Sequence, residues 1–228
     1  MIKGKGSGKS QIINYDGIKY YYEKDYKFAY YILSKQTDDK SLYTLGLMYL
    51  NGNYVEKNTH IALDYFHKAE RLGNIDSLYH LSIIYYNDKL IHSKDLSFKY
   101  MKKAYDNKHP KSYFELSFYY KKGVGCEYNF ERYLELLIEG SQLYNCELCN
   151  LFIAHHYYDE VRDYKKAFHY YNLSAKKNNL NAHKSLAYMY SKGEGCKKNI
   201  TKSIYHYCIS GYDEYADELE EYECKTED

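Results

Sequence analysis

The sequence contains one cluster of residues with the types and spacing of metal ligands. Cys146 and Cys149 are three residues apart, and His155 and His156 follow in the same segment. Cys149 and His156 would share a helix face, and Cys146 is placed to join them. A structural zinc site needs four ligands in a closed arrangement. These four side chains would form one only if the fold happened to bring them together. We expect ordinary buried or half-exposed thiols here, with no metal and no cofactor.

A second motif lies at the amino terminus, where Gly4–Ser10 reads GKGSGKS. It has the composition of a phosphate-binding loop, G-x-x-x-x-G-K-[ST], which follows a strand. The first glycine of that motif would fall at Lys3, and only two residues precede Lys3. We therefore predict that residues 1–11, which are rich in glycine, serine and lysine, form a disordered basic tail.

Catalytic patterns are not found among the remaining residues. The ten histidines are scattered, and no Ser-His-Asp set or carboxylate pair occurs beside a glycine elbow or an oxyanion donor. An enzyme needs such a constellation, so we predict that the chain is not an enzyme.

The chain is organised by repetition instead. From Ser41 a similar stretch recurs five times with a period of about 36 residues, which is typical of one supersecondary unit copied and stacked. The copies span 41–76, 77–111, 112–148, 149–181 and 182–214.

Each copy contains two helical stripes. The first stripe is a pair of apolar residues four apart, which share one helix face: Leu45 and Tyr49, Leu81 and Tyr85, Leu116 and Tyr120, Ile153 and Tyr157, Leu186 and Tyr190. A small residue follows the first member and lets a second helix approach: Gly46, Ser82, Ser117, Ala154 and Ala187. The second stripe is small and aromatic, as in Ala62, Tyr65, Phe66 and Ala69. Glycines between the stripes permit the positive φ of a reversing chain, which predicts a helix, a tight turn and a helix.

These residues resemble the Sel1-like repeat, a relative of the tetratricopeptide repeat. Leu45–Gly52 is the most similar first half and Lys166–Tyr171 the most similar second half, and the resemblance covers about 41–214. It implies an all-α, right-handed superhelical solenoid of helix-turn-helix repeats, and an adaptor or scaffold without an active site. Tyr133 and Gly140 depart from the family's small residues in the third copy.

The resemblance also implies a site, because the first helix of each tetratricopeptide unit lines the concave face. The residues two positions either side of the buried stripe would then face the groove: Tyr43, Leu47, Tyr79, Ile83, Phe114, Phe118, Leu151, His155, Lys184 and Tyr188. The alternative is that these aromatic residues are simply more core, in a chain with 34 tyrosines. The sequence does not decide between the two.

Charge and hydropathy narrow the range of partners. The 32 basic and 31 acidic residues leave a net charge of +1, whereas nucleic-acid binding normally needs a basic excess. No apolar run approaches the ~20 residues of a membrane helix, and no secretory signal is recognised. We therefore expect an intracellular, cytoplasmic protein with six reduced cysteines. The residue usage, rich in tyrosine, asparagine and lysine, is typical of an AT-rich genome such as that of an amoeba or a large DNA virus.

The segments flanking the repeats are predicted as caps. Residues 12–40 contain Asp16-Gly17 between two β-prone runs, which indicates either a short β-hairpin or a competing helix. Residues 25–35 are predicted as the second helix of a degenerate first unit. Residues 215–228 are predicted as an acidic capping helix and tail, because a terminal repeat needs a polar outer face.

Three functions of different kinds follow. The first is a non-catalytic interaction module, a monomer that binds a peptide or protein partner on the concave face. The second is a structural or assembly component that stacks through its terminal repeats. The most distant is a small enzyme or metal protein that uses the histidine-rich fourth copy. Exposed aromatic residues on the inner face would favour the first, because aromatic anchors dominate binding energies.

Overall fold

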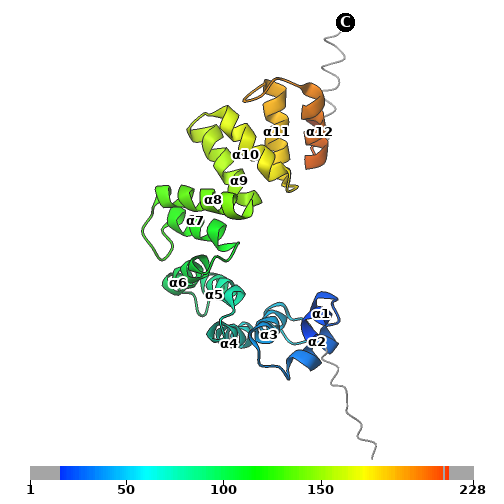
Figure 1. Cartoon of the computed structure of the whole chain (residues 1–228), viewed down its shortest axis with the longest axis vertical. Helices are drawn as coiled ribbons and strands as arrows, with labels where there is room; N and C mark the ends of the chain where they lie inside the picture. Colours follow the sequence, from blue (N-terminus) through cyan, green and yellow to red (C-terminus); the bar gives the residue numbers. More distant parts are fainter. Residues whose placement is uncertain (1–15, 213, 216–228) are drawn as a thin grey trace, which may run out of the picture. The chain divides into compact units, whose positions relative to one another are not determined.

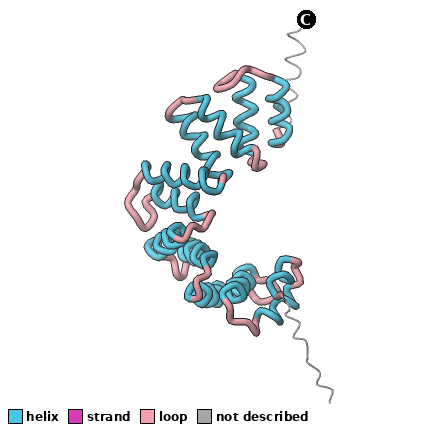
Figure 2. Tube along the Cα trace, viewed as in Figure 1, coloured by secondary structure: helices cyan, strands magenta, loops and turns pink. Residues whose placement is uncertain are grey.

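The computed structural model describes residues 16–212, 214 and 215. All regular elements in this part of the chain are helices (Figures 1 and 2), which confirms the all-α prediction. They are α1 (Gly17–Tyr22), α2 (Tyr26–Leu33), α3 (Asp39–Asn51), α4 (Thr59–Arg71), α5 (Ile75–Asn87), α6 (Lys94–Asp106), α7 (Ser112–Lys122), α8 (Phe130–Tyr144), α9 (Glu147–His155), the π-helix η1 (His156–Glu160), α10 (Tyr164–Ala175), α11 (Leu180–Lys192) and α12 (Ile200–Ser210). The predicted tail at 1–11 and almost all of the predicted cap at 215–228 lie outside the described residues.

The described residues form two compact units, which divide between Asp88 and Lys89. In the first unit, α3 packs on α4 and α4 on α5, while α1 and α2 pack on each other and on α3. The core of this unit contains Ala29, Leu33, Leu45 and Met48, with tyrosines around it. Tyr30 and Tyr49 share a hydroxyl hydrogen bond of 3.2 Å, which links α2 to the first predicted repeat.

Asp16 and Gly17 begin a helix, so the β-hairpin alternative for this segment is wrong. The Asp16 carboxylate accepts hydrogen bonds from the main-chain N–H groups of Ile18 at 3.1 Å and Lys19 at 3.2 Å. These bonds satisfy amide groups that a helix start leaves without partners, which is the usual role of an aspartate N-cap. The following helix α2, Tyr26–Leu33, lies within the segment predicted to be helical at 25–35.

In the second unit, successive helices form antiparallel hairpins: α7 with α8, α9 with α10, and α11 with α12. Figure 1 shows α11 and α12 lying side by side. The second helices of three copies begin in the same way, with an asparagine whose side chain accepts from an N–H three residues on: Asn58, Asn129 and Asn199. Together with the repeated stripes, these caps determine where each hairpin turns.

The first member of the predicted core stripe is buried in all five copies. These first members are at most 1% exposed, while the tyrosines of the stripe are half-buried. The small residues that follow the first members are all buried. At Gly46, an added Cβ would lie 2.7 Å from the Phe66 ring of the paired helix. The small side chains therefore permit the close helix contact that the sequence indicated.

Candidate functional site

The ten predicted groove residues differ in exposure. Leu151 is buried, Lys184 and Tyr188 are exposed, and the other seven are half-buried: Tyr43, Leu47, Tyr79, Ile83, Phe114, Phe118 and His155. Most of them thus retain accessible surface. Their assignment to a binding face stays a prediction.

In the first unit, Tyr43 and Tyr79 belong to one aromatic cluster around His80. The Tyr43 hydroxyl lies 3.4 Å from His80 Nδ1, and the His80 ring stacks on Phe66 with centroids 5.3 Å apart. Tyr79 contacts the same imidazole edge to face. Burial, and then the Asp76 carboxylate, raises the pKa of Tyr43 well above its usual range. Tyr43 therefore packs within this cluster while part of its surface stays accessible.

In the second unit, the predicted residues of the third and fourth copies are joined into a row of rings. Phe114 and Phe118 on α7 are 4.9 Å apart between centroids, and Phe118 is 5.0 Å from Phe152 on α9. Phe152 in turn contacts His155, which lies edge to face on Tyr171 of α10 at 5.6 Å. Sequence analysis did not assign Phe152 and Tyr171 to this row, in which Phe152 is half-buried and Tyr171 is buried.

A cavity of about 390 Å³ lies at the Tyr171 end of this row of rings. Two of its lining residues, Lys184 and Tyr188, were predicted from the sequence. The others come from η1, α10, α11 and α12, and the full lining is Tyr158, Tyr171, Lys184, Ser185, Tyr188 and Tyr207. Four of the six are tyrosines, so the cavity has aromatic walls with hydroxyl groups.

The π-helix η1 places Tyr158 in this cavity. A π-turn holds more residues per turn than an α-helix, so it changes the direction of the side chains that follow. The Tyr158 ring packs on Tyr164 at 5.2 Å, and its hydroxyl donates to Glu194 Oε2 at 2.5 Å. This bond ties the end of the fourth repeat's first helix to the turn between α11 and α12.

The cavity has tyrosine hydroxyls in its wall and lysines on and beside it, and the Glu194 carboxylate accepts from the Tyr158 hydroxyl. Burial raises the pKa of Tyr171 to about 12, and burial followed by the Glu194 contact raises that of Tyr158, so both hydroxyls stay protonated at neutral pH. The Lys184 ammonium lies 3.9 Å over the Tyr212 ring. The Lys192 ammonium lies 5.9 Å from the Tyr188 ring on the same helix. Such an arrangement can hold an apolar side chain that is flanked by an acidic group.

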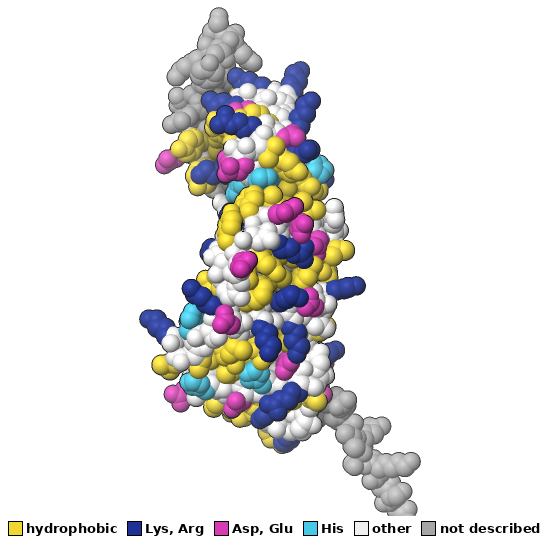
Figure 3. All heavy atoms as spheres, turned by 90° about the vertical axis from the view of Figure 1, so that its left-hand side faces the viewer, with side chains coloured by type: hydrophobic (Ala, Val, Ile, Leu, Met, Phe, Trp, Pro, Cys, Tyr) yellow, Lys and Arg dark blue, Asp and Glu magenta, His cyan; other side chains and the backbone are white. Residues whose placement is uncertain are grey.

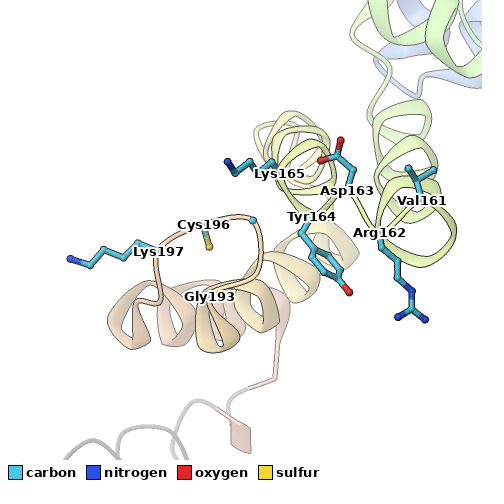
Figure 4. A pocket seen from close by; sticks show the side chains of 9 residues that line it. Val161, Arg162, Asp163, Tyr164, Lys165, Gly193, Cys196 and Lys197 are labelled. Atoms are coloured by element: carbon cyan, nitrogen blue, oxygen red, sulfur yellow. The ribbon is translucent and has the colours of Figure 1, made fainter.

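A larger hollow of about 780 Å³ lies between the start of α10 and the turn after α11. Of its basic side chains, Arg162 points away from Lys165 and Lys197, which extend to the same side with their ammonium groups apart, as Figure 4 shows. Because no two of them converge on one point, this hollow has no focused charge for an anionic ligand. On the face shown in Figure 3, acidic and basic side chains are interspersed with hydrophobic patches.

In the structure the two cysteines of the suggested metal site lie at one end of α9 and the two histidines at the other. Cys146 caps α9 and Cys149 is buried against α8, while His155 and His156 line the far end of the same helix. Across residues 16–212, 214 and 215, no three histidine, cysteine or acidic side chains are grouped to hold a metal ion. In the same part of the chain, no helix is both long and apolar enough to cross a membrane.

The paired helices, their buried small residues and their repeated caps define a helical-repeat solenoid. The family model of the Sel1 repeat matches residues 39–74, 75–109, 110–137, 148–179 and 181–211, so the chain belongs to the Sel1 repeat family. Proteins of this family are generally protein-interaction modules and generally non-enzymatic. No similar sequence was found among curated proteins.

Solved structures share the fold. A Sel1 repeat protein from Oxalobacter formigenes is 24% identical with a TM-score of 0.74, over 86% of this chain and 84% of that one. The protective antigen c5321 of uropathogenic Escherichia coli is 21% identical with a TM-score of 0.66, over 86% of this chain and 44% of that one. The immunity protein PA5088 from Pseudomonas aeruginosa is 18% identical with a TM-score of 0.59, over 89% of this chain and 82% of that one. At these identities the likeness concerns the fold alone.

Proposed function

We propose that this chain is a non-catalytic interaction module that holds a peptide or protein segment on the face formed by the first helices of its repeats. The observation that carries the proposal is the aromatic surface of the second unit, which runs from Phe114 to the tyrosine-lined cavity. Large aromatic side chains supply most of the binding energy at protein interfaces. Here several of them keep accessible surface instead of closing into the core.

The cavity supplies the anchor point of this surface. Tyr188 is 43% exposed, and the lysines at 184 and 192 lie one turn before and one turn after it on α11. A partner segment would insert an apolar side chain between the tyrosines and place an acidic neighbour against Lys184. The near-neutral net charge of +1 fits a protein partner better than a nucleic acid.

The test is affinity capture from source cells with four baits: the unchanged chain, Lys184→Glu, Tyr188→Ala and Tyr205→Ala. Tyr205 is the matched control, because it is a 61% exposed tyrosine on α12 that does not line the cavity. We expect a protein that the unchanged chain and Tyr205→Ala retain and that both cavity variants lose. If every bait retains the same proteins, the cavity is not the binding site.

A further inference from the structure

Cys146 occupies a capping position that other copies fill with a hydrogen-bond acceptor. The first helices α3, α5 and α11 are capped by Asp38, Asn74 and Asn179. Each of these side chains accepts from the main-chain N–H three residues on, at 3.0, 2.9 and 3.0 Å. At the start of α9 the acceptor is the Cys146 sulfur, 3.2 Å from the Cys149 nitrogen.

This position favours a negatively charged sulfur. A neutral thiol is a weak acceptor, whereas a thiolate accepts strongly and interacts well with the positive end of a helix. The hydrogen bond from the Cys149 thiol, aided by main-chain N–H groups and opposed by burial and Glu147, lowers the pKa of Cys146 to about 7. The same thiol–thiol hydrogen bond, together with burial, raises the pKa of Cys149.

The two cysteines also differ in access. Cys146 is partly exposed, whereas Cys149 is fully buried in the cluster with Tyr133, Leu137 and Ile153. A disulfide between residues three apart is strained when both residues lie within one helix. Cys146 instead precedes the helix with extended backbone, at φ −63° and ψ 120°, and its sulfur is turned back toward Cys149.

We propose that Cys146 and Cys149 form a thiol–disulfide exchange site whose oxidant is a low-molecular-weight disulfide. The Cys146 thiolate attacks one sulfur of the oxidant, which forms a mixed disulfide and releases one thiolate. The Cys149 sulfur then attacks Cys146 Sγ, its proton passes to the departing sulfur, and the second thiol leaves. The two protein thiols are oxidised to one disulfide, and the small disulfide is reduced to two thiols.

This site is separate from the proposed peptide-binding cavity. In the first, second and fifth copies the place of Cys149 holds Ser41, Ser77 and Ala182, which are small buried residues. If Cys149 only filled the space of these small residues, the cap at Cys146 would not need to be a second thiol. The exchange site therefore predicts chemistry that core packing alone does not.

The first test measures the ionisation of Cys146 in the reduced, full-length chain. Alkylation by iodoacetamide is followed from about pH 5 to about pH 9, and peptide mass spectrometry locates the labelled cysteine. We expect an inflection near pH 7, and a rate at neutral pH roughly threefold to fivefold that of a model-peptide thiol. Cys149→Ala removes the thiol donor, and its inflection should move to higher pH. An inflection at about 8.5 in the unchanged chain would overturn the proposal.

The second test follows oxidation by oxidised glutathione. The unchanged chain should form the 146–149 disulfide and become two hydrogen atoms lighter, and Cys149→Ala should stop at a glutathione adduct on Cys146. Cys146→Asp, which restores the capping oxygen that Asp38 supplies in the first copy, should fold normally and leave the buried Cys149 unmodified. A stable glutathione adduct on Cys146 of the unchanged chain would show that Cys149 does not resolve it, and would contradict the proposal.

Discussion

Gly195 lies directly against the main-chain carbonyl of Tyr164, the first residue of α10, and a Cβ added to this glycine would overlap the carbonyl oxygen. Gly125 makes the same contact with the carbonyl of Lys94, the first residue of α6. The second glycine of each Gly-x-Gly turn therefore serves the packing of consecutive repeats as well as the turn itself. The spacing of the glycines alone indicated only the turn.

Gly195→Ala should destabilise the chain more than Gly211→Ala does. Both glycines have positive φ, at 68° and 76°, so each substitution costs about 1 kcal/mol of backbone strain. Gly211 has open space around its Cβ position, whereas Gly195 also meets the Tyr164 carbonyl. We expect an additional loss of about 1–3 kcal/mol for Gly195→Ala, measured as the free energy of unfolding in urea. Equal losses in the two variants would show that this contact is unimportant.

Gly46→Ala should destabilise α3 although alanine is the better helix former. Helix propensity alone would favour alanine by about 1 kcal/mol. The added methyl group would lie 2.7 Å from the ring of Phe66, which is fully buried. We expect a net loss of about 1 kcal/mol in the free energy of unfolding. Lys40→Ala, an exposed substitution on the same helix, should change it little. A gain in stability for Gly46→Ala would mean that the two helices can separate at low cost.

Tyr54 has the left-handed backbone that the third and fifth copies give to glycine. Its φ is 67°, its side chain is 55% exposed, and its ring contacts Tyr30 at 5.8 Å. Tyr54→Ala removes the ring but keeps a Cβ, whereas Tyr54→Gly removes the strain as well. The free energy of unfolding, measured in urea, should therefore be about 1 kcal/mol greater for the glycine variant than for the alanine variant. Equal stabilities would place the strain elsewhere in the turn.

The periodic part of the fold could be predicted from the sequence because burial follows the helical period. Leu45, Leu81 and their counterparts recur at fixed spacing, and each is buried where the spacing places it. Tyr158 could not be placed in the cavity, because the π-turn changes the register of the side chains after His155. No repeat of residue types signals that change. The capping role of Cys146 could not be predicted either, because cysteine is not among the usual N-cap residues.

The structure was needed to decide between a hairpin and a helix at Asp16-Gly17. Asp16-Gly17 suits a tight hairpin turn and a helix start equally well, and the two hydrogen bonds to Asp16 show the helix. The asparagine caps of the second helices could have been predicted from the sequence. An asparagine precedes the second stripe at the same distance in three copies, and asparagine is a preferred N-cap.

His206 should make the stability of the last repeat depend on pH. Its ring stacks on Tyr190 at 5.6 Å, and its Nδ1 lies 2.8 Å from His183 Nδ1, so one of the two nitrogens must accept. Burial, followed by the charges of His183 and Lys202, lowers the pKa of His206 to about 4. In the unfolded chain the pKa of a histidine is about 6.5. Between these values the unfolded state binds more protons, so the free energy of unfolding is greatest above about pH 6.5 and falls as the pH is lowered toward 4.

The variant His206→Tyr isolates this effect. Tyr65 and Tyr170 occupy the same place in the first and fourth copies, where they stack on Tyr49 and Tyr157, so the ring contact is retained while the titrating group is lost. Urea unfolding at about pH 7 and about pH 5 should show that the unchanged chain loses more stability than the variant does. We expect the two losses to differ by about 1 kcal/mol, because solvent screening at the half-buried ring reduces the full linkage value. If the unchanged chain and the variant lost equal stability, protonation of His206 would not oppose folding, and the short contact with His183 would have to persist in acid.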